Sequence, residues 1–263
     1  MSRARPTGPV ARLWRGAATS WPALAAACVA TSLALAPNPL TWRRPVRDEF
    51  WRFAALAGPG SLLAMVAAGV VVGAGLIGQA TYWLEQVGQF GAVARTLTIL
   101  LIREVTPVVV GLVSLGRVGL ANLAELQAMR ASGTIRALEA QGLDPFVLFV
   151  LPRTLALGLC VLAHALVFLV VAVVAGYVTA NLMGVSTQDV FGVARRTTRV
   201  IGEVGYLVLP LKTLSIGFAI GAVTAVTALG PPPRGGTTTL LASGFFRTLV
   251  AMVLISLVGS LLL

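Results

Sequence analysis

The feature that most constrains this chain is a series of long apolar stretches, each about the length of a membrane-crossing helix. Five stretches hold roughly 20 or more predominantly apolar residues, enough for a helix to cross the hydrocarbon core of a bilayer. Lipid offers no partner to backbone polar groups, so a single spanning segment has to be helical. We therefore predict an all-α integral membrane protein with five transmembrane helices, at about residues 54–77, 93–115, 146–181, 204–229 and 240–263.

The composition excludes both a soluble enzyme and a disordered chain. Hydrophobic residues make up 57% of the 263 residues and charged residues only 11%, whereas soluble domains have about 25% charged residues and disordered chains are polar. The net charge of +11 would indicate nucleic acid in a soluble protein. In a chain this apolar it instead predicts basic residues at the cytoplasmic membrane surface and no nucleic-acid partner.

A shorter apolar segment, Trp21–Leu35, precedes the first long stretch and has only 15 residues. We predict that it is a helix lying in the membrane interface. The alternative is the apolar region of a signal peptide, because arginines precede it, but proline and arginine follow where a small-residue cleavage site is needed. On this interpretation residues 1–53 form a basic N-terminal segment and residues 54–263 form the five-helix domain.

The distribution of basic residues predicts the orientation of the chain. With the N-terminus in the cytoplasm, fourteen of the twenty Lys and Arg residues fall in cytoplasmic segments and four in segments on the opposite side. The remaining two, Arg103 and Lys212, lie within the predicted spans. Cytoplasmic loops carry the excess of Lys and Arg, so we predict a cytoplasmic N-terminus and a C-terminus on the outer side.

The connection between the second and third stretches, residues 117–145, is polar but keeps a helical pattern. Residues 135–140 read as a short amphipathic helix, which Gly142 can terminate. Asp144 followed by Pro145 fits an N-cap with proline at the first helical position. A short helix held rigidly between two spans is what a transporter needs to accept force from a separate motor subunit. The alternative is an ordinary loop helix.

No segment has the pattern of a catalytic, nucleotide or metal site. The chain has no P-loop, no HExxH and no CxxC, and His164 is its only histidine. We expect no catalytic residue, no metal and no cofactor in this chain, so any ATP would be used by a partner subunit. Cys28 and Cys160 lie far apart in apolar stretches, where they are expected to be small buried hydrophobic residues.

Seven short motifs follow one another in residues 101–156. They are Leu101-Ile102-Arg103-Glu104 with Pro107; Gly116-Arg117-Val118-Gly119; Ala124-Glu125-Leu126; Met129; Ala137-Leu138-Glu139; Gly142-Leu143-Asp144-Pro145; and Pro152-Arg153 with Leu155-Ala156. In this order the motifs resemble the MlaE/YrbE family of ABC transporter permeases. The layout of a basic N-terminus, an interfacial helix and five spans is also similar to that of the family.

The resemblance implies a lipid-transporting permease in a bacterial inner membrane. It implies a homodimer that works with a separate ATPase, an MCE-domain lipid-binding protein and a small STAS-type regulatory subunit, and that moves phospholipid or a related lipid. It also implies roles for individual residues: Arg103, Glu104 and Lys212 on the lipid pathway, Ile135, Arg136, Leu138 and Glu139 in contact with the ATPase, and Gly116, Arg117, Gly119, Glu125, Asp144, Pro145, Pro152 and Arg153 in the structural motifs.

Several alternatives remain open from the sequence. Arg103, Glu104 and Lys212 can instead form an ion-pair network that fixes helix packing. Together with His164 they would also suit an ion-driven secondary carrier, and a non-transporting permease scaffold is a third function. The fourth and fifth stretches depart from the family pattern, since Glu203 lies nine residues before Lys212 and three prolines, 231–233, precede the last stretch.

Overall fold

The computed structural model describes residues 21–38, 41–87, 99–184, 190–230 and 236–262, and this part of the chain is helical and contains no strand. Three π-helical turns interrupt or extend the α-helices. The elements are α2 (Trp21–Leu35), α3 (Arg44–Val87), η1 (Leu101–Val105), α5 (Thr106–Ser114), η2 (Leu115–Gly119), α6 (Leu120–Ala131), α7 (Thr134–Ala140), η3 (Phe146–Val150), α8 (Leu151–Leu182), α9 (Val190–Leu229) and α10 (Gly236–Leu262).

Within the described residues, five helical segments are long and apolar enough to cross a membrane, which confirms the predicted all-α class and the five spans. The last three lie within four residues of the predicted bounds, whereas the first begins at Arg44, ten residues before its predicted start. Residues 93–98 of the predicted second span lie outside the described residues. The segments are Arg44–Leu76, Leu101–Ala131, Phe146–Leu182, Leu207–Leu229 and Gly236–Leu261.

The second spanning segment differs most from its prediction, because it continues to Ala131 rather than ending near Leu115. Its apolar pattern weakens after Leu115, but η2 and α6 continue the helix without a break. Leu123 and Leu126 of α6 are fully buried, in a cluster that includes residues of α9. The helical pattern predicted for this polar connection is therefore realised as a direct continuation of the second span, with one face buried by tertiary packing.

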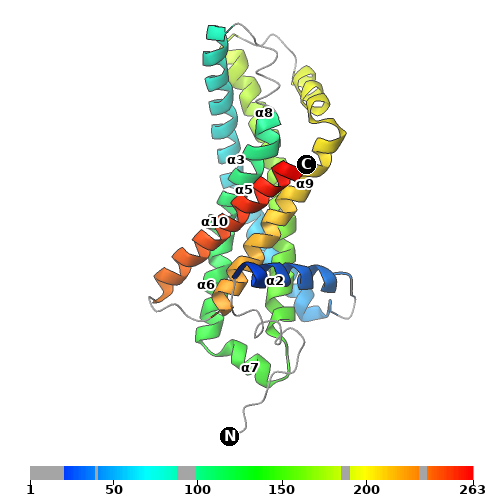
Figure 1. Cartoon of the computed structure of the whole chain (residues 1–263), viewed down its shortest axis with the longest axis vertical. Helices are drawn as coiled ribbons and strands as arrows, with labels where there is room; N and C mark the ends of the chain where they lie inside the picture. Colours follow the sequence, from blue (N-terminus) through cyan, green and yellow to red (C-terminus); the bar gives the residue numbers. More distant parts are fainter. Residues whose placement is uncertain (1–20, 39–40, 88–98, 185–189, 231–235, 263) are drawn as a thin grey trace.

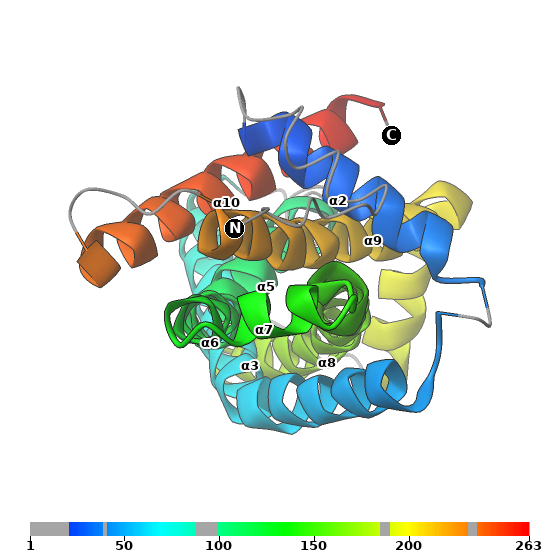
Figure 2. The ribbon, with the colours of Figure 1, turned by 90° about the horizontal axis from the view of Figure 1, so that it is seen from below.

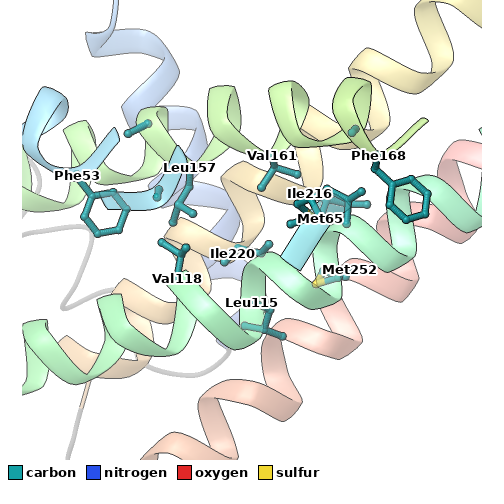
Figure 3. Packing of buried hydrophobic residues seen from close by; sticks show 14 of the residues in the cluster. Phe53, Met65, Leu115, Val118, Leu157, Val161, Phe168, Ile216, Ile220 and Met252 are labelled. Atoms are coloured by element: carbon teal, nitrogen blue, oxygen red, sulfur yellow. The ribbon is translucent and has the colours of Figure 1, made fainter. Parts of the chain in front are cut away.

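The helices form an elongated bundle with α7 at one end (Figure 1). Seen from that end, α9 lies between α2 and α10 on one side and α6 and α8 on the other, and α3 covers the far side of α8 (Figure 2). A buried apolar cluster fills the bundle, with Leu115, Val161, Ile216 and Met252 contributed by four different elements (Figure 3). The α7 end and the opposite end are therefore connected by continuous packed helices.

Small residues set the closest helix approaches. A Cβ at Gly217 would lie 2.7 Å from the Cα of Gly158, so α8 and α9 touch backbone to backbone at this crossing. A Cβ at Gly69 would lie 3.1 Å from the carbonyl oxygen of Phe168. Gly69 thus accommodates the contact of α3 with α8 within one chain.

The short apolar helix α2 has the bounds that the sequence predicts, Trp21–Leu35. It crosses the bundle at a steep angle near the α7 end and packs on α9 and α8 (Figure 1). The indole Nε1 of Trp42 donates a 2.6 Å hydrogen bond to the carbonyl of Ala36 and holds the turn after α2. Cys28 on the inner face of α2 is a free, buried thiol, and burial raises its pKa to about 12.

Candidate functional site

The helix α7 is bounded on both sides by glycines in the left-handed region. Gly133, at φ +82°, precedes Thr134, and Gly142, at φ +77°, follows the last turn. Leu143 N–H donates to the Leu138 carbonyl at 3.0 Å, and Gly142 N–H donates to the Glu139 carbonyl at 3.1 Å. This is the Schellman arrangement of a helix C-terminus. The predicted helix over residues 135–140 and its termination at Gly142 are confirmed.

The side chains of α7 separate into a buried side and an exposed side. Ile135 is buried and Leu138 is half-buried, while Arg136 and Glu139 are exposed. The chain then re-enters the bundle at Asp144, whose Oδ1 accepts a 2.9 Å hydrogen bond from the Phe146 N–H. Asp144 is therefore the N-cap that the sequence predicts, with Pro145 as the first helical residue.

A polar cluster lies toward the opposite end of the bundle, and we call it the Lys212 cluster. The Lys212 ammonium donates to the Glu104 carboxylate at 3.2 Å, to the Ser260 hydroxyl at 2.7 Å and to the Arg103 backbone carbonyl at 2.7 Å. Ser260 in turn donates to Glu104 Oε1 at 2.6 Å. The cluster joins η1, α9 and α10, and it contains two of the three residues predicted for the lipid pathway.

The local sequence explains why a carbonyl is available to Lys212. In a regular helix the N–H of residue 107 would bond to the carbonyl of Arg103, but Pro107 has no N–H. The freed carbonyl accepts the lysine ammonium instead. On the other side of the lysine, Gly259 leaves room for its aliphatic stem, because a Cβ there would lie 3.1 Å from the Lys212 side chain.

Exposure distinguishes the members of the Lys212 cluster. The Lys212 side chain is only 1% exposed, whereas that of Glu104 is 38% exposed. Arg103 is partly exposed, and only its backbone joins the cluster. Glu104 and Lys212 form an ion pair between helices, and the Glu104 carboxylate and the Arg103 side chain are partly exposed. The side chain of Glu203 lies outside the described set.

A second polar cluster, the Arg153 cluster, lies near the base of α7. The Arg153 guanidinium is 1% exposed; its Nε donates to Glu49 at 2.7 Å, and Nη1 and Nη2 each donate to Glu125 at 3.1 Å. Nη1 also donates to Asn122 at 3.2 Å. Arg52 bonds to Glu49 at 2.8 Å and to Glu125 at 2.9 Å. The charges of two arginines and two glutamates therefore balance. At the centre, Arg153 binds both carboxylate oxygens of Glu125 in a bidentate pair.

The surroundings of Arg153 extend this cluster to further elements. Its guanidinium lies 5.3 Å from the ring centroid of Phe53 and 5.6 Å from that of Phe149, within cation–π range. The amide of Asn122 donates to the Thr224 hydroxyl of α9 at 2.9 Å. The cluster thereby links α3, α6, η3, α8 and α9.

The sequence singled out Glu125 and Arg153 of this cluster but not their partners. Glu49 and Arg52 stand at the i, i+3 spacing of a helical ion pair, which is the one local signal that could have singled them out. Asn122 and Glu49 meet Arg153 across 31 and 104 residues of chain. No local pattern shows such pairings.

The remaining motif residues are scattered rather than gathered into a site. Gly119 packs closely on Ile220, and Pro152 is buried at the start of α8. Gly116 and Arg117 are exposed. His164 of α8 is buried and its Nε2 lies 3.0 Å from the carbonyl of Gly58. Among the described residues no group of three or more His, Cys, Asp or Glu side chains suits a metal ion.

Comparisons with known proteins identify the family of this chain. The family model described as Permease MlaE matches residues 50–262. A probable ABC transporter permease protein of Rickettsia prowazekii (strain Madrid E) is 27% identical over 135 residues, which cover 51% of each chain. A probable ABC transporter permease protein of Rickettsia felis is 33% identical over 98 residues, 37% of this chain and 36% of that protein. The aligned region thus spans about half or less of these relatives.

Proposed function

The chain belongs to the MlaE permease family, and from this premise we propose that it is the membrane subunit of an ABC transporter that moves phospholipid or a related lipid. In this proposal a separate ATPase supplies the energy, and an MCE-domain protein exchanges lipid with the permease. The chain itself contributes no catalytic residue. The relatives named as probable ABC transporter permeases support the general class.

The observation that carries the proposal is the way α7 is held. Its N-terminal arm, α6, is continuous with the second spanning segment, and its C-terminal side leads through η3 into α8. Force applied to α7 therefore acts on two spanning segments directly. The exposed Arg136 and Glu139 provide the surface that an ATPase would contact, while Ile135 anchors the helix inward.

The Lys212 cluster supports the lipid pathway. Charged groups at membrane depth face a cavity or a partner rather than lipid tails, and Glu104 and Arg103 are both partly exposed. We propose that the Arg103 guanidinium attracts the phosphate of a lipid headgroup and that the Lys212–Glu104 pair fixes the helices around it. A homodimer would enclose this surface between two copies.

The same proposal places the chain in the bacterial inner membrane, with a cytoplasmic N-terminus, α7 on the cytoplasmic side and a periplasmic C-terminus. The five spans support the multi-pass topology. The excess of basic residues in the segments assigned to the cytoplasm supports the orientation. A small STAS-type subunit on the cytoplasmic side belongs to this proposal as well.

The proposal is tested by purifying the tagged chain from its native host in mild detergent and identifying bound protein and lipid. We expect an ATPase and phospholipid to copurify, and the complex to transfer fluorescent phospholipid between vesicles when ATP is added. Arg136→Ala with Glu139→Ala should release the ATPase, and Asp48→Asn, an exposed change outside α7, should retain it. Absence of both the ATPase and lipid, or transport that follows an ion gradient without ATP, would overturn the proposal.

A further inference from the structure

The Arg153 cluster lies where motion of α7 would have to enter the bundle. Both arms of α7 contribute to it, since Glu125 is on α6 and Arg153 follows η3 on α8. These two residues bridge the arms directly through two 3.1 Å hydrogen bonds. A change in the distance between the arms must therefore stretch or break this contact.

The cluster also ties both arms to helices that α7 does not touch along the chain. Arg153 binds Glu49 of α3 at 2.7 Å, the shortest of its contacts, and Asn122 of α6 binds Thr224 of α9. Further toward α7, the Arg130 guanidinium donates to the carbonyl oxygens of Ala228 and Gly230 at the end of α9. Through these contacts α3 and α9 would follow the arms.

The chemistry of the cluster is poorly explained by stability alone. A buried ion pair is expensive to desolvate, and apolar residues of similar volume often give equal or better stability. What a buried, bidentate ion pair does provide is a defined geometry, because the planar guanidinium donates hydrogen bonds in only a few fixed directions. The rings of Phe53 and Phe149 restrict it further.

The contacts are also unequal in a way that suits a moving connection. Glu49 is largely buried, whereas Glu125 is 39% exposed and is shared between Arg153 and Arg52. Glu125 can therefore leave Arg153 for water or for Arg52 at a modest cost, while the pairing of α3 with α8 stays intact. The break would occur between α6 and α8.

We propose that the Arg153 cluster is a transmission joint, in which Glu125, Arg153 and Glu49 are positioning residues that pass motion of α7 to α3 and α9. This inference rests on the proposed function, since it assumes an ATPase that moves α7. It assigns to Glu125 the contact that yields during the cycle and to Glu49–Arg153 the contact that persists.

The test compares Glu125→Gln with the natural chain in the complete complex with its ATPase, reconstituted in phospholipid vesicles. Glutamine keeps the size and one acceptor but removes the charge. We expect the complex to assemble and hydrolyse ATP, while the amount of phospholipid transferred per ATP falls about fivefold or more. Asp48→Asn, also on the α7 side and outside the cluster, is the matched control and should leave this ratio unchanged.

A second measurement is independent of the lipid cargo. Leu56 of α3 is 52% exposed, so Leu56→Cys, in a chain with Cys160→Ala, is a reporter that a permeant maleimide can reach. Nucleotide bound to the ATPase should change its labelling rate when Glu125 is present and not in Glu125→Gln. If Glu125→Gln does not assemble, Arg52→Gln, at the exposed edge of the cluster, is compared in the same way.

The outcomes separate the two proposals. An unchanged lipid-to-ATP ratio together with an unchanged nucleotide effect on Leu56→Cys would show that the cluster is only a structural tie, and would overturn the joint. A natural complex that transfers no phospholipid, but still shows the nucleotide effect and loses it in Glu125→Gln, would overturn the lipid assignment and support the joint.

Discussion

The two polar clusters use the same kinds of groups in opposite ways. Glu104 and Glu125, one from each cluster, lie 21 residues apart on one continuous helical segment, about 30 Å at 1.5 Å per residue, which matches the hydrocarbon thickness of a bilayer. In the Lys212 cluster a buried cation meets a partly exposed carboxylate and few other partners. In the Arg153 cluster a buried cation is enclosed by two carboxylates, an amide and two rings.

The difference indicates that the two clusters have different functions. An ion pair whose carboxylate is partly exposed can exchange that partner for a ligand. The Arg153 guanidinium is 1% exposed and enclosed by protein groups, so it is closed to a ligand and acts on the helices that hold it. We therefore expect the Arg153 cluster to dominate stability and mechanical coupling, and the Lys212 cluster to dominate contact with cargo.

The largest effect is expected for Arg153→Ala. The two glutamates would lose their buried cation and keep only the exposed Arg52, and Glu49 is too buried for water to compensate. Removing one partner of a buried pair costs about 3–5 kcal/mol of unfolding free energy. Chemical unfolding of the purified protein in detergent measures this loss, and Asp48→Asn controls for the loss of a charge on the same side. If Arg153→Ala lost less unfolding free energy than Lys212→Ala, the Arg153 cluster would not be the one that dominates stability.

Lys212→Ala is expected to cost less, about 1–2 kcal/mol, because Glu104 keeps the Ser260 hydroxyl and is less buried than Glu49. Its effect on transport should exceed its effect on stability. Unfolding and ATP-dependent phospholipid transfer, measured on the same preparation, separate the two. Lys212→Arg, which keeps the charge but not the shape, should recover stability more than transport. Equal recovery of both would argue that the cluster only packs helices.

Ser260→Ala tests the hydrogen bonds of the Lys212 cluster with a smaller change. The hydroxyl donates to Glu104 and accepts from Lys212, so its loss removes two hydrogen bonds but no charge. We expect about 1 kcal/mol of lost unfolding free energy. Ser256→Ala, one turn earlier on α10, is the matched control and should cost less, because its buried hydroxyl has no hydrogen-bond partner among the described residues. Indistinguishable losses would contradict the assigned hydrogen bonds.

Local signals predicted the parts of this molecule that depend on local structure. Gly142 and Asp144 mark the ends of the segments around α7, and both do so by hydrogen bonds within a few residues. The five spans follow from hydropathy in the same way. Hydropathy did not predict the extension of the second span to Ala131, because the burial of Leu123 and Leu126 depends on helices that are distant in sequence.

The site residues show the same limit more sharply. Hydropathy marks Arg103, Glu104 and Lys212 equally as charges in apolar surroundings, yet the structure pairs only Glu104 with Lys212. Two other residues decide how these charges pair. Pro107 leaves the Arg103 carbonyl free for Lys212, and Ser260, which is 48 residues from Lys212, bonds to both Lys212 and Glu104. Likewise, the sequence assigned Glu49 to the basic N-terminal segment, whereas in the structure it lies on α3 and binds Arg153.

The smallest effect is expected for Arg52→Ala, and it decides whether the Arg153 cluster acts through its centre or its edge. Arg52 is 48% exposed and bonds to the same two glutamates as Arg153. Exposed ion pairs contribute about 0–1 kcal/mol, so unfolding free energy should change little and Arg153 should hold both carboxylates. A loss of unfolding free energy close to that of Arg153→Ala would show that the two arginines stabilise the glutamates equally. In that case the burial of Arg153 would no longer explain why this cluster, rather than the Lys212 cluster, holds the helices together.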